Sequence, residues 1–234
     1  MMTDKSVLQD CNHLQKIGVI SQKGVNSDFV LGTYYVIGNL LRSCGGLGKY
    51  QVFQVQNSSP FVEPLVYKGI QQAILEERYT QRGYCQINAE PIMNGMLEYS
   101  AAHPDTEFVM VMKDSIYVKD LNYFLGVNRK ALSRRGHLLN TTIISCGENS
   151  PFEMDALTFQ SVLKHELGHR FGTTDQRNRN PGELYNYKEL GTHCTTPGCI
   201  MNVANSLRDG QLAARRRATY CPACLRAIKR ELSR

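Results

Sequence analysis

The chain has 234 residues, a formal net charge of +6 and eight cysteines, and 42% of its residues are hydrophobic. This length suits one domain of generous size, or one domain with a small appended lobe, and it can bury a core without disulfide bonds. The first twenty residues carry charged and polar side chains where a signal peptide would have an apolar run. No segment approaches the roughly 18 to 20 apolar residues of a membrane span. We therefore expect a cytoplasmic protein with reduced thiols and no membrane partner.

The first third of the chain predicts strands and a helix. DFVLGTYYVIGNLLRSCGG (28–46) is apolar and ends at a glycine pair, which fits either a strand or a short buried helix. YQVFQVQ (50–56) alternates Val and Phe with Gln, which predicts a strand with one buried face. Residues 58–83 begin with Ser and Pro, run apolar at helical spacing and close at Gly83, which predicts a helix packed on a sheet.

The middle third predicts the centre of that sheet. CQINAEPIM (85–93) indicates a loop or a short strand, whereas EFVMVMKDSIYV (107–118) predicts a strong central strand. RGHLLNTTIISC (135–146) is rich in β-branched residues and predicts another strand. Strands and helices in this order indicate a mixed α/β (α+β) fold, in which helices pack on a twisted sheet.

A long helix is predicted after residue 149. Ser150, Pro151 and Glu153 match a capping box, with Ser at the N-cap and Pro at the first helical position. His165 and His169 fall on a different side of this helix from its apolar face, so they are free to point into a cleft. That apolar face, which we expect to pack against the sheet, consists of Phe152, Ala156, Phe159, Leu163 and Leu167.

The stretch HELGH (165–169) predicts a metal site. Residues four apart on a helix lie above one another, so His165 and His169 can present both imidazoles to one zinc ion. In such a site Glu166 reaches the zinc-activated water instead of the metal and serves as the general base.

Two glycines bear on this site. Gly168 costs about 1 kcal/mol inside a helix, which a close approach by neighbouring backbone would explain. Gly172 accepts the positive φ that a helix needs to turn directly after its second ligand, and the chain then returns to the metal at Asp175. The extended pattern HExxHxxGxxH/D is far more specific than HExxH alone.

Two closely spaced cysteine pairs follow, separated by a loop: Cys194 with Cys199, and Cys221 with Cys224. Four thiolates in tetrahedral geometry form a structural zinc site, which contributes folding energy directly. Disulfides are the alternative reading, which a reducing compartment disfavours. The remaining four cysteines have no ligand spacing and are expected to be buried thiols: Cys11, Cys44, Cys85 and Cys146.

These motifs resemble those of the archaemetzincins, a branch of the metzincin metallopeptidases. HCTTPGCIM (193–201) is similar to the family's His-Cys, four residues, Cys, one residue and Met, and CPAC (221–224) to its Cys-x-x-Cys. The resemblance, specific from about residue 150 to 230, implies a zincin-like mixed twisted sheet, a backing helix, an active-site helix and a small C-terminal four-cysteine zinc lobe (about 193–230). It also implies that Met201 is the Met of the Met-turn, an apolar floor beneath the catalytic ion.

The chain departs from the family at one place. Family members put the third ligand and the first structural Cys side by side, whereas residues 176–192 here separate Asp175 from His193. Either Asp175 has replaced the family histidine, or the loop was inserted before the ligand and His193 has kept its place. We favour Asp175, because the turn at Gly172 fixes its position whereas a long loop must be guided back.

The leading hypothesis is a zinc-dependent metallopeptidase with two zinc ions, one catalytic and one structural. Its catalytic domain would span residues 50–234, after an N-terminal segment (1–49) of unclear role. We expect a monomer that acts on a peptide or protein lying extended along an edge strand, with LLNTTIIS (138–145) as the candidate strand.

The alternative is a non-catalytic zinc-binding protein whose cysteine lobe and basic tail bind a partner or nucleic acid. Retention of Glu166 counts against it, because a purely structural site has no use for that base. We expect no nucleic-acid partner, since a charge run is usually the solvated face of a terminal helix. The charges of this tail are Arg215, Arg216, Arg217, Arg226, Lys229, Arg230 and Arg234.

Overall fold

The computed structural model describes residues 14–55, 69, 72–73, 78–79, 85–118, 121–132, 138–148, 150, 153–173, 185–188, 191–202 and 207–233. No helix within these ranges is long and apolar enough to cross a membrane. The helix expected over 58–83 lies largely outside them. Residues 69, 72 and 73 are helical, but Arg78–Tyr79 form strand β3, so the helix does not continue to Gly83.

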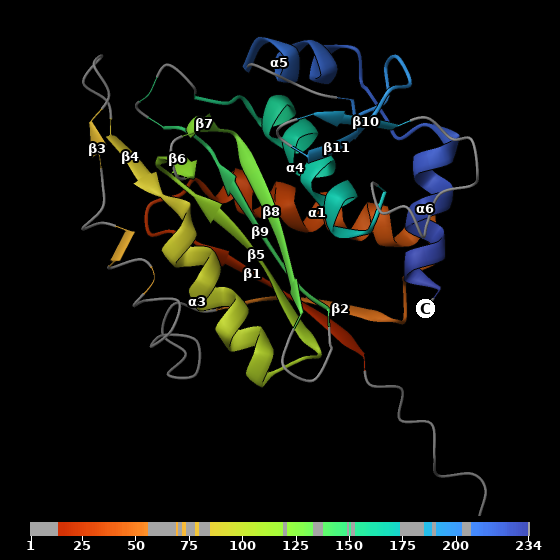
Figure 1. The fold of residues 1–234 in the computed structure, drawn as a ribbon, viewed down its shortest axis with the longest axis horizontal. Coiled ribbons are helices and arrows are strands. Elements are labelled where there is room, and N and C mark those ends of the chain that lie inside the picture. Colours follow the sequence, from red (N-terminus) through yellow and green to blue (C-terminus); the bar gives the residue numbers. More distant parts are fainter. Residues whose placement is uncertain are drawn as a thin grey trace, which may run out of the picture.

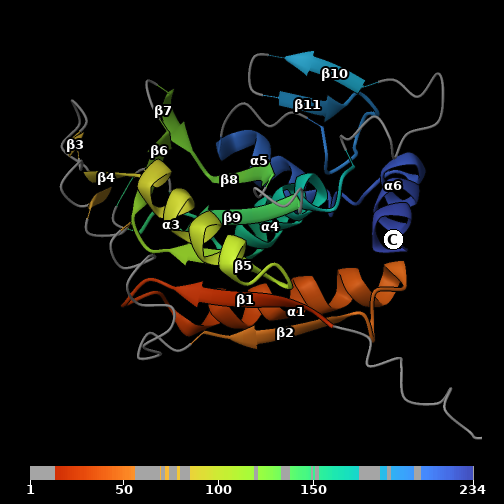
Figure 2. The same ribbon diagram turned by 60° about the horizontal axis from the view of Figure 1, so that its bottom comes forward.

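A five-stranded sheet forms the centre of the molecule, in the order β2-β1-β5-β9-β8 (Figures 1 and 2). The first four strands are parallel to one another, and β8 pairs antiparallel with β9. The strands span Gln15–Ser21 (β1), Tyr50–Gln54 (β2), Thr106–Met112 (β5), Gly126–Leu132 (β8) and Leu138–Ser145 (β9).

Two expectations about these strands are wrong. The segment 107–118 is not one strand: β5 ends at Met112, and β6 (Ser115–Val118) joins a second sheet of order β3-β4-β6-β7, with β4 at Cys85–Asn88 and β7 at Leu121–Phe124. LLNTTIIS, which is β9, lies between β5 and β8 instead of at an edge. The edge strand on that side is β8.

The N-terminal part of the chain belongs to this sheet. Strand β1 is paired on both sides, with β2 and with β5. The ambiguous segment that follows is helix α1 (Ser27–Cys44), which begins where Asn26 Oδ1 accepts a hydrogen bond from the Asp28 N–H and ends at Gly45 with φ of 80°. Residues before position 50 therefore form part of the same sheet as the residues that follow it.

Helices cover both faces of the sheet. On one face, α1 and α4 (Ala156–Arg170) pack against Ile17, Val19, Val109 and Val111; on the other, α3 (Ala89–Ala102) packs against Ile20, Phe108, Met110 and Met112. Both sets follow the alternation of side chains along β1 and β5. Helix α3 was not expected from CQINAEPIM; it begins at Asn88, whose side chain accepts a hydrogen bond from the Glu90 N–H.

The start of α4 also differs from the expectation. Asp155 is its N-cap, because its carboxylate accepts hydrogen bonds from the N–H and hydroxyl of Thr158. The Ser150 hydroxyl instead donates to the Gly147 carbonyl. Of the predicted core face, Phe159, Leu163 and Leu167 are buried as expected, Ala156 is exposed, and Phe152 lies outside the described residues.

The C-terminal part forms a small lobe beside α4. It contains the hairpin β10 (Tyr185–Lys188) and β11 (Gly191–Cys194), then α5 (Leu207–Arg215) and α6 (Pro222–Leu232). Helix α6 packs against the α1 side through Ile228 and Leu232, while its basic side chains are exposed. Figures 1 and 2 both place β11 beside α4.

Candidate metal centres

The C-terminal end of α4 turns as the glycine predicts. Gly172 has φ of 70°, in the left-handed region that favours glycine. Its N–H donates to the His169 carbonyl, and the Thr173 N–H donates to the Gly168 carbonyl, which together make a Schellman motif. Asp175 lies outside the described residues, so the structure does not place it.

Three histidines converge at this end of the helix. His165 and His169 come from α4, and His193 comes from β11, which the hairpin with β10 brings over the helix. One nitrogen from each ring lies within 4.8 Å of the other two. The ring centroids are 4.8 to 5.2 Å apart. His193, which residues 176–192 separate from Asp175 in the sequence, therefore lies close to His165 and His169 in the structure.

The geometry of these rings suits one zinc ion. Two nitrogens at about 2.0–2.1 Å from a tetrahedral zinc are about 3.3–3.4 Å apart. The Nε2 atoms of His165 and His169 are 3.1 Å apart. The Nδ1 atom of His165 lies 2.8 Å from the Ile200 carbonyl oxygen, which accepts its N–H and leaves Nε2 as the lone-pair nitrogen.

Burial keeps the imidazoles of His165 and His169 neutral, which is the form that binds a metal. Burial lowers the pKa of His165 to about 4, against the hydrogen bond to Ile200, which raises it; the neighbouring His193 lowers it further. Burial likewise holds the pKa of His169 well below its usual value, and His165, His193 and Lys130 add to this effect.

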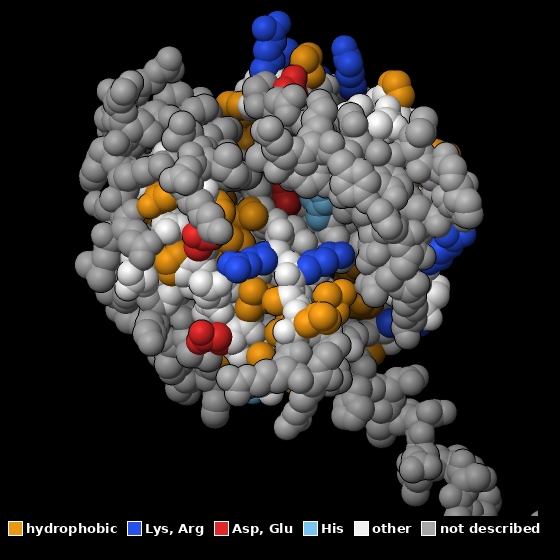
Figure 3. Space-filling model, viewed as in Figure 1, with side chains coloured by type: hydrophobic (Ala, Val, Ile, Leu, Met, Phe, Trp, Pro, Cys, Tyr) orange, Lys and Arg blue, Asp and Glu red, His pale blue; other side chains and the backbone are white. Residues whose placement is uncertain are grey.

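Glu166, the residue directly after His165 on α4, is a buried carboxyl group. It is 8% exposed, and it has no hydrogen-bond or ion-pair partner among the described residues. Burial raises its pKa to about 8. A Cβ at Gly126 would lie 2.8 Å from Glu166 Cγ, so the side chain lies directly against edge strand β8. Acidic and histidine atoms lie at the floor of a hollow on the face shown in Figure 3.

The structure gives a reason for Gly168. A Cβ at this position would lie 2.1 Å from Met201 Sδ and 3.0 Å from Tyr220 Cε1. The close approach is therefore made by two side chains, not by backbone as the sequence suggested. Met201 is fully buried, and its sulfur lies against Gly168 of α4.

The four cysteines predicted as a cluster come together. Their sulfur atoms lie within 4.8 Å of one another, with Cys194–Cys221 at 3.7 Å and Cys199–Cys224 at 3.6 Å. Four sulfurs at about 2.3 Å from a tetrahedral zinc are about 3.8 Å apart, whereas a disulfide needs about 2.05 Å. The cluster therefore fits a metal ion, and the cysteines are free thiols. Of the others, Cys44 and Cys146 are buried as expected, while Cys11 and the side chain of Cys85 are outside the described part.

Comparison with solved structures gave two similar chains. The crystal structure of an archaemetzincin from Methanopyrus kandleri has a TM-score of 0.56 and 18% sequence identity, and the match covers 97% of this chain and 100% of that one. The chain has an archaemetzincin-like fold. A zinc-dependent peptidase from Methanocorpusculum labreanum is similar at a TM-score of 0.47 and 14% identity, over 91% of this chain and 99% of that one. No family model and no curated protein sequence matches the chain.

Within this archaemetzincin-like fold, sequence reasoning missed three contributors to the site. The Ile200 carbonyl orients His165, and the Tyr220 hydroxyl donates to the Lys164 carbonyl one residue earlier. Arg170, which follows His169, is buried and forms an ion pair with Glu107 of β5. Arg170 could have been recognised in the sequence as a charged residue on the helix face that packs on the sheet. No local sequence pattern indicates the contacts of Ile200 and Tyr220.

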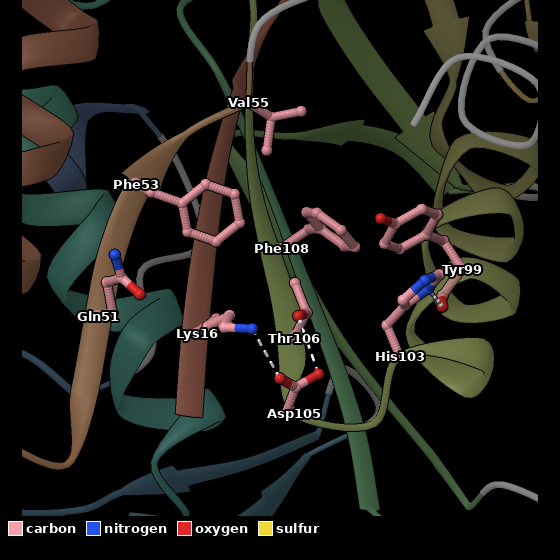
Figure 4. Close-up of a pocket in the computed structure, with 9 residues that line it drawn as sticks. All are labelled: Lys16, Gln51, Phe53, Val55, Tyr99, His103, Asp105, Thr106 and Phe108. Carbon is pink, nitrogen blue, oxygen red and sulfur yellow. Dashed lines mark hydrogen bonds and ion pairs between the residues drawn. The ribbon is translucent and has the colours of Figure 1, made fainter. Parts of the chain in front are cut away.

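A pocket of about 490 Å³ lies on the other face of the archaemetzincin-like sheet, between β2 and α3 (Figure 4). Phe53 and Phe108 point into it, and the ion pair of Lys16 with Asp105 closes one end. None of the residues of the two metal clusters lines this pocket.

Proposed function

We propose that this protein is a zinc-dependent metallopeptidase. The observation that carries the proposal is the convergence of three histidine nitrogens beside Glu166, a buried carboxyl group without a partner among the described residues. A buried carboxyl group without a hydrogen-bond or ion-pair partner does not stabilise the fold, so it is a candidate for a functional role. The archaemetzincin-like fold supports the same reading.

His193 is the third ligand in this proposal, in place of Asp175. Its ring stands 5.2 Å from that of His165 and 5.0 Å from that of His169, measured between centroids. Three neutral imidazoles and one open position are a common ligand set for catalytic zinc. The four cysteines would hold a second, structural ion, so the protein would carry two zinc ions.

Bound at the histidines, zinc would polarise a peptide carbonyl and make water more acidic. Glu166 would take the proton of the attacking water and pass it to the leaving amine. The substrate would pair with the outer edge of β8, because Gly126 of that strand lies against Glu166. The absence of a side chain at Gly126 leaves room for Glu166 beside the strand.

The test compares two glutamine variants. Glu166→Gln should keep zinc content and fold but lose about 10²- to 10⁴-fold in the hydrolysis of a fluorogenic peptide library. Glu153→Gln is the matched control, because Glu153 is exposed and lies before α4; it should retain activity. Zinc content is measured by elemental analysis and the fold by circular dichroism.

Two results would contradict the proposal. If Glu166→Gln turns over peptides at the wild-type rate, Glu166 is not the base. If the folded wild-type protein with both sites loaded cleaves no peptide of the library, the protein is not a peptidase of this kind, and the non-catalytic zinc-binding function takes its place.

A further inference from the structure

The two metal clusters share one short stretch of chain. His193 and Cys194 are adjacent residues that belong to different clusters. The Cys194 N–H donates to the Met201 carbonyl at 2.9 Å, so the strand that carries both residues is tied to the loop after Cys199. The carbonyl of Ile200, directly after Cys199, accepts the hydrogen bond of His165 Nδ1.

The second cysteine pair is tied to the same loop and to α4. The Ile200 N–H donates to the Thr219 carbonyl at 2.9 Å, and the Cys221 N–H donates to Cys199 Sγ, 3.3 Å away. Between Thr219 and Cys221, the hydroxyl of the partly buried Tyr220 donates to the Lys164 carbonyl. The backbone segments that hold the sulfurs are therefore the ones that contact α4 beside His165.

A metal ion bound to all four sulfur atoms would hold these segments together. Without the ion, no covalent bond joins the four sulfur atoms, so the segments that carry them are free to move relative to one another. Movement at Cys199 displaces the Ile200 carbonyl, and movement at Cys194 displaces His193. Each displacement changes the orientation of a ligand of the histidine cluster.

We propose that zinc in the four-cysteine cluster positions the histidine site, so that the two sites bind zinc cooperatively and the thiolate site fills first. Tyr220 is a positioning residue in this coupling, because its hydroxyl joins the lobe to the helix at Lys164. Coupling of binding is reciprocal, so an ion at the histidines strengthens the thiolate site by the same factor. The inference rests on the two-site assignment proposed above, but not on peptide hydrolysis.

Titration of the metal-free, reduced protein with Co²⁺, followed by competition with Zn²⁺, tests the coupling. Thiolate-bound cobalt gives strong charge-transfer absorption, so the first equivalent should raise that band to its full height and the second should change only the weaker visible bands. In Cys221→Ser/Cys224→Ser, the zinc affinity of the histidine site should fall at least about tenfold. The control is Cys146→Ala, which removes a buried thiol outside the cluster and should leave both affinities unchanged.

A milder variant keeps the test decisive if the double serine variant does not fold. Tyr220→Phe should keep the full charge-transfer band while weakening zinc binding at the histidines roughly three- to tenfold. Tyr99→Phe makes the same chemical change on α3, in the other core, and should have no effect.

The outcomes separate the coupling from the proposed function. A histidine site of wild-type affinity in the folded double serine variant overturns the coupling. Where that variant is unfolded, a histidine-site affinity within twofold of wild type in Tyr220→Phe overturns it. A single metal ion per wild-type chain would refute the two-site assignment itself, whereas two independent sites would refute only the coupling.

Discussion

We expect the loss of the ion pair between Arg170 and Glu107, next to the histidine cluster in the chain, to lower the stability of the protein strongly. Arg170 is 2% exposed, the residue directly after His169, and its partner on β5 has a side chain that is 15% exposed. Asn140 of β9 donates a hydrogen bond of 2.9 Å to the other Glu107 oxygen. The pair thus fixes the last turn of α4 to two central strands.

Glu107→Gln removes the charge of the carboxylate but keeps an acceptor for Asn140. Removal of one partner from a buried pair costs about 3–5 kcal/mol, because the other charge stays buried without compensation. The residual exposure of Glu107 places the expected loss at the lower end, about 3 kcal/mol. For a chain of this size, each kcal/mol lowers the melting temperature by about 2–4 °C, so we expect a decrease of about 6–12 °C.

The assay is thermal unfolding of the zinc-loaded protein, monitored by circular dichroism. The double variant Glu107→Gln/Arg170→Met should be more stable than the single Glu107→Gln, because neither charge is left alone. Asp105→Asn is the control: its pair with Lys16 is 3.0 Å long but 43% and 34% exposed, and its loss should cost less than about 1 kcal/mol. Equal melting temperatures for Glu107→Gln and Asp105→Asn would refute the reasoning.

Three further results are expected. Gly168→Ala should lower the zinc affinity of the histidine site, since the new Cβ displaces Met201. Gly38→Ala in α1, where a Cβ would meet nothing within 4 Å, should leave zinc affinity unchanged and stabilise the protein by up to about 1 kcal/mol. Equal zinc affinities for the two variants would contradict the role of the close approach. His193→Ala should empty the histidine site while Asp175→Ala reduces zinc affinity by at most about 10- to 100-fold; elemental analysis that gives the reverse order would show Asp175 to be the ligand. Chelation of the cysteine-bound zinc should lower the melting temperature, since its binding is coupled to folding; an unchanged transition would rule out a structural role for that ion.

The parts of the site that depend on local spacing could be read from the sequence. His165 and His169 share one face because they are four residues apart on a helix, and Gly172 takes a positive φ because a helix must end there. The four cysteines could be grouped because their two pairs have metal-ligand spacing. The mixed α/β class followed in the same way, from periodicity along each segment.

Competition between nearby hydrogen-bond partners made the start of α4 harder to predict from the sequence. Ser150 has the sequence of an N-cap, but its hydroxyl donates to the Gly147 carbonyl, and Asp155 caps α4 instead. A side chain that can bond to several nearby backbone groups is assigned by the path of the chain, which the sequence pattern does not give.

Only the tertiary structure decided the order of the strands and the position of His193 close to His165 and His169. β9 mixes apolar residues with Asn, Thr and Ser and shows no strict alternation, so its sequence does not specify a position in the sheet. Its place between β5 and β8 depends on crossovers from distant segments. β1 was not recognised because its pairing partners lie far along the chain. His193 reaches the histidines of α4 through the β10–β11 hairpin, and the return point of a long loop is set by pairing and packing, not by the residues next to the motif.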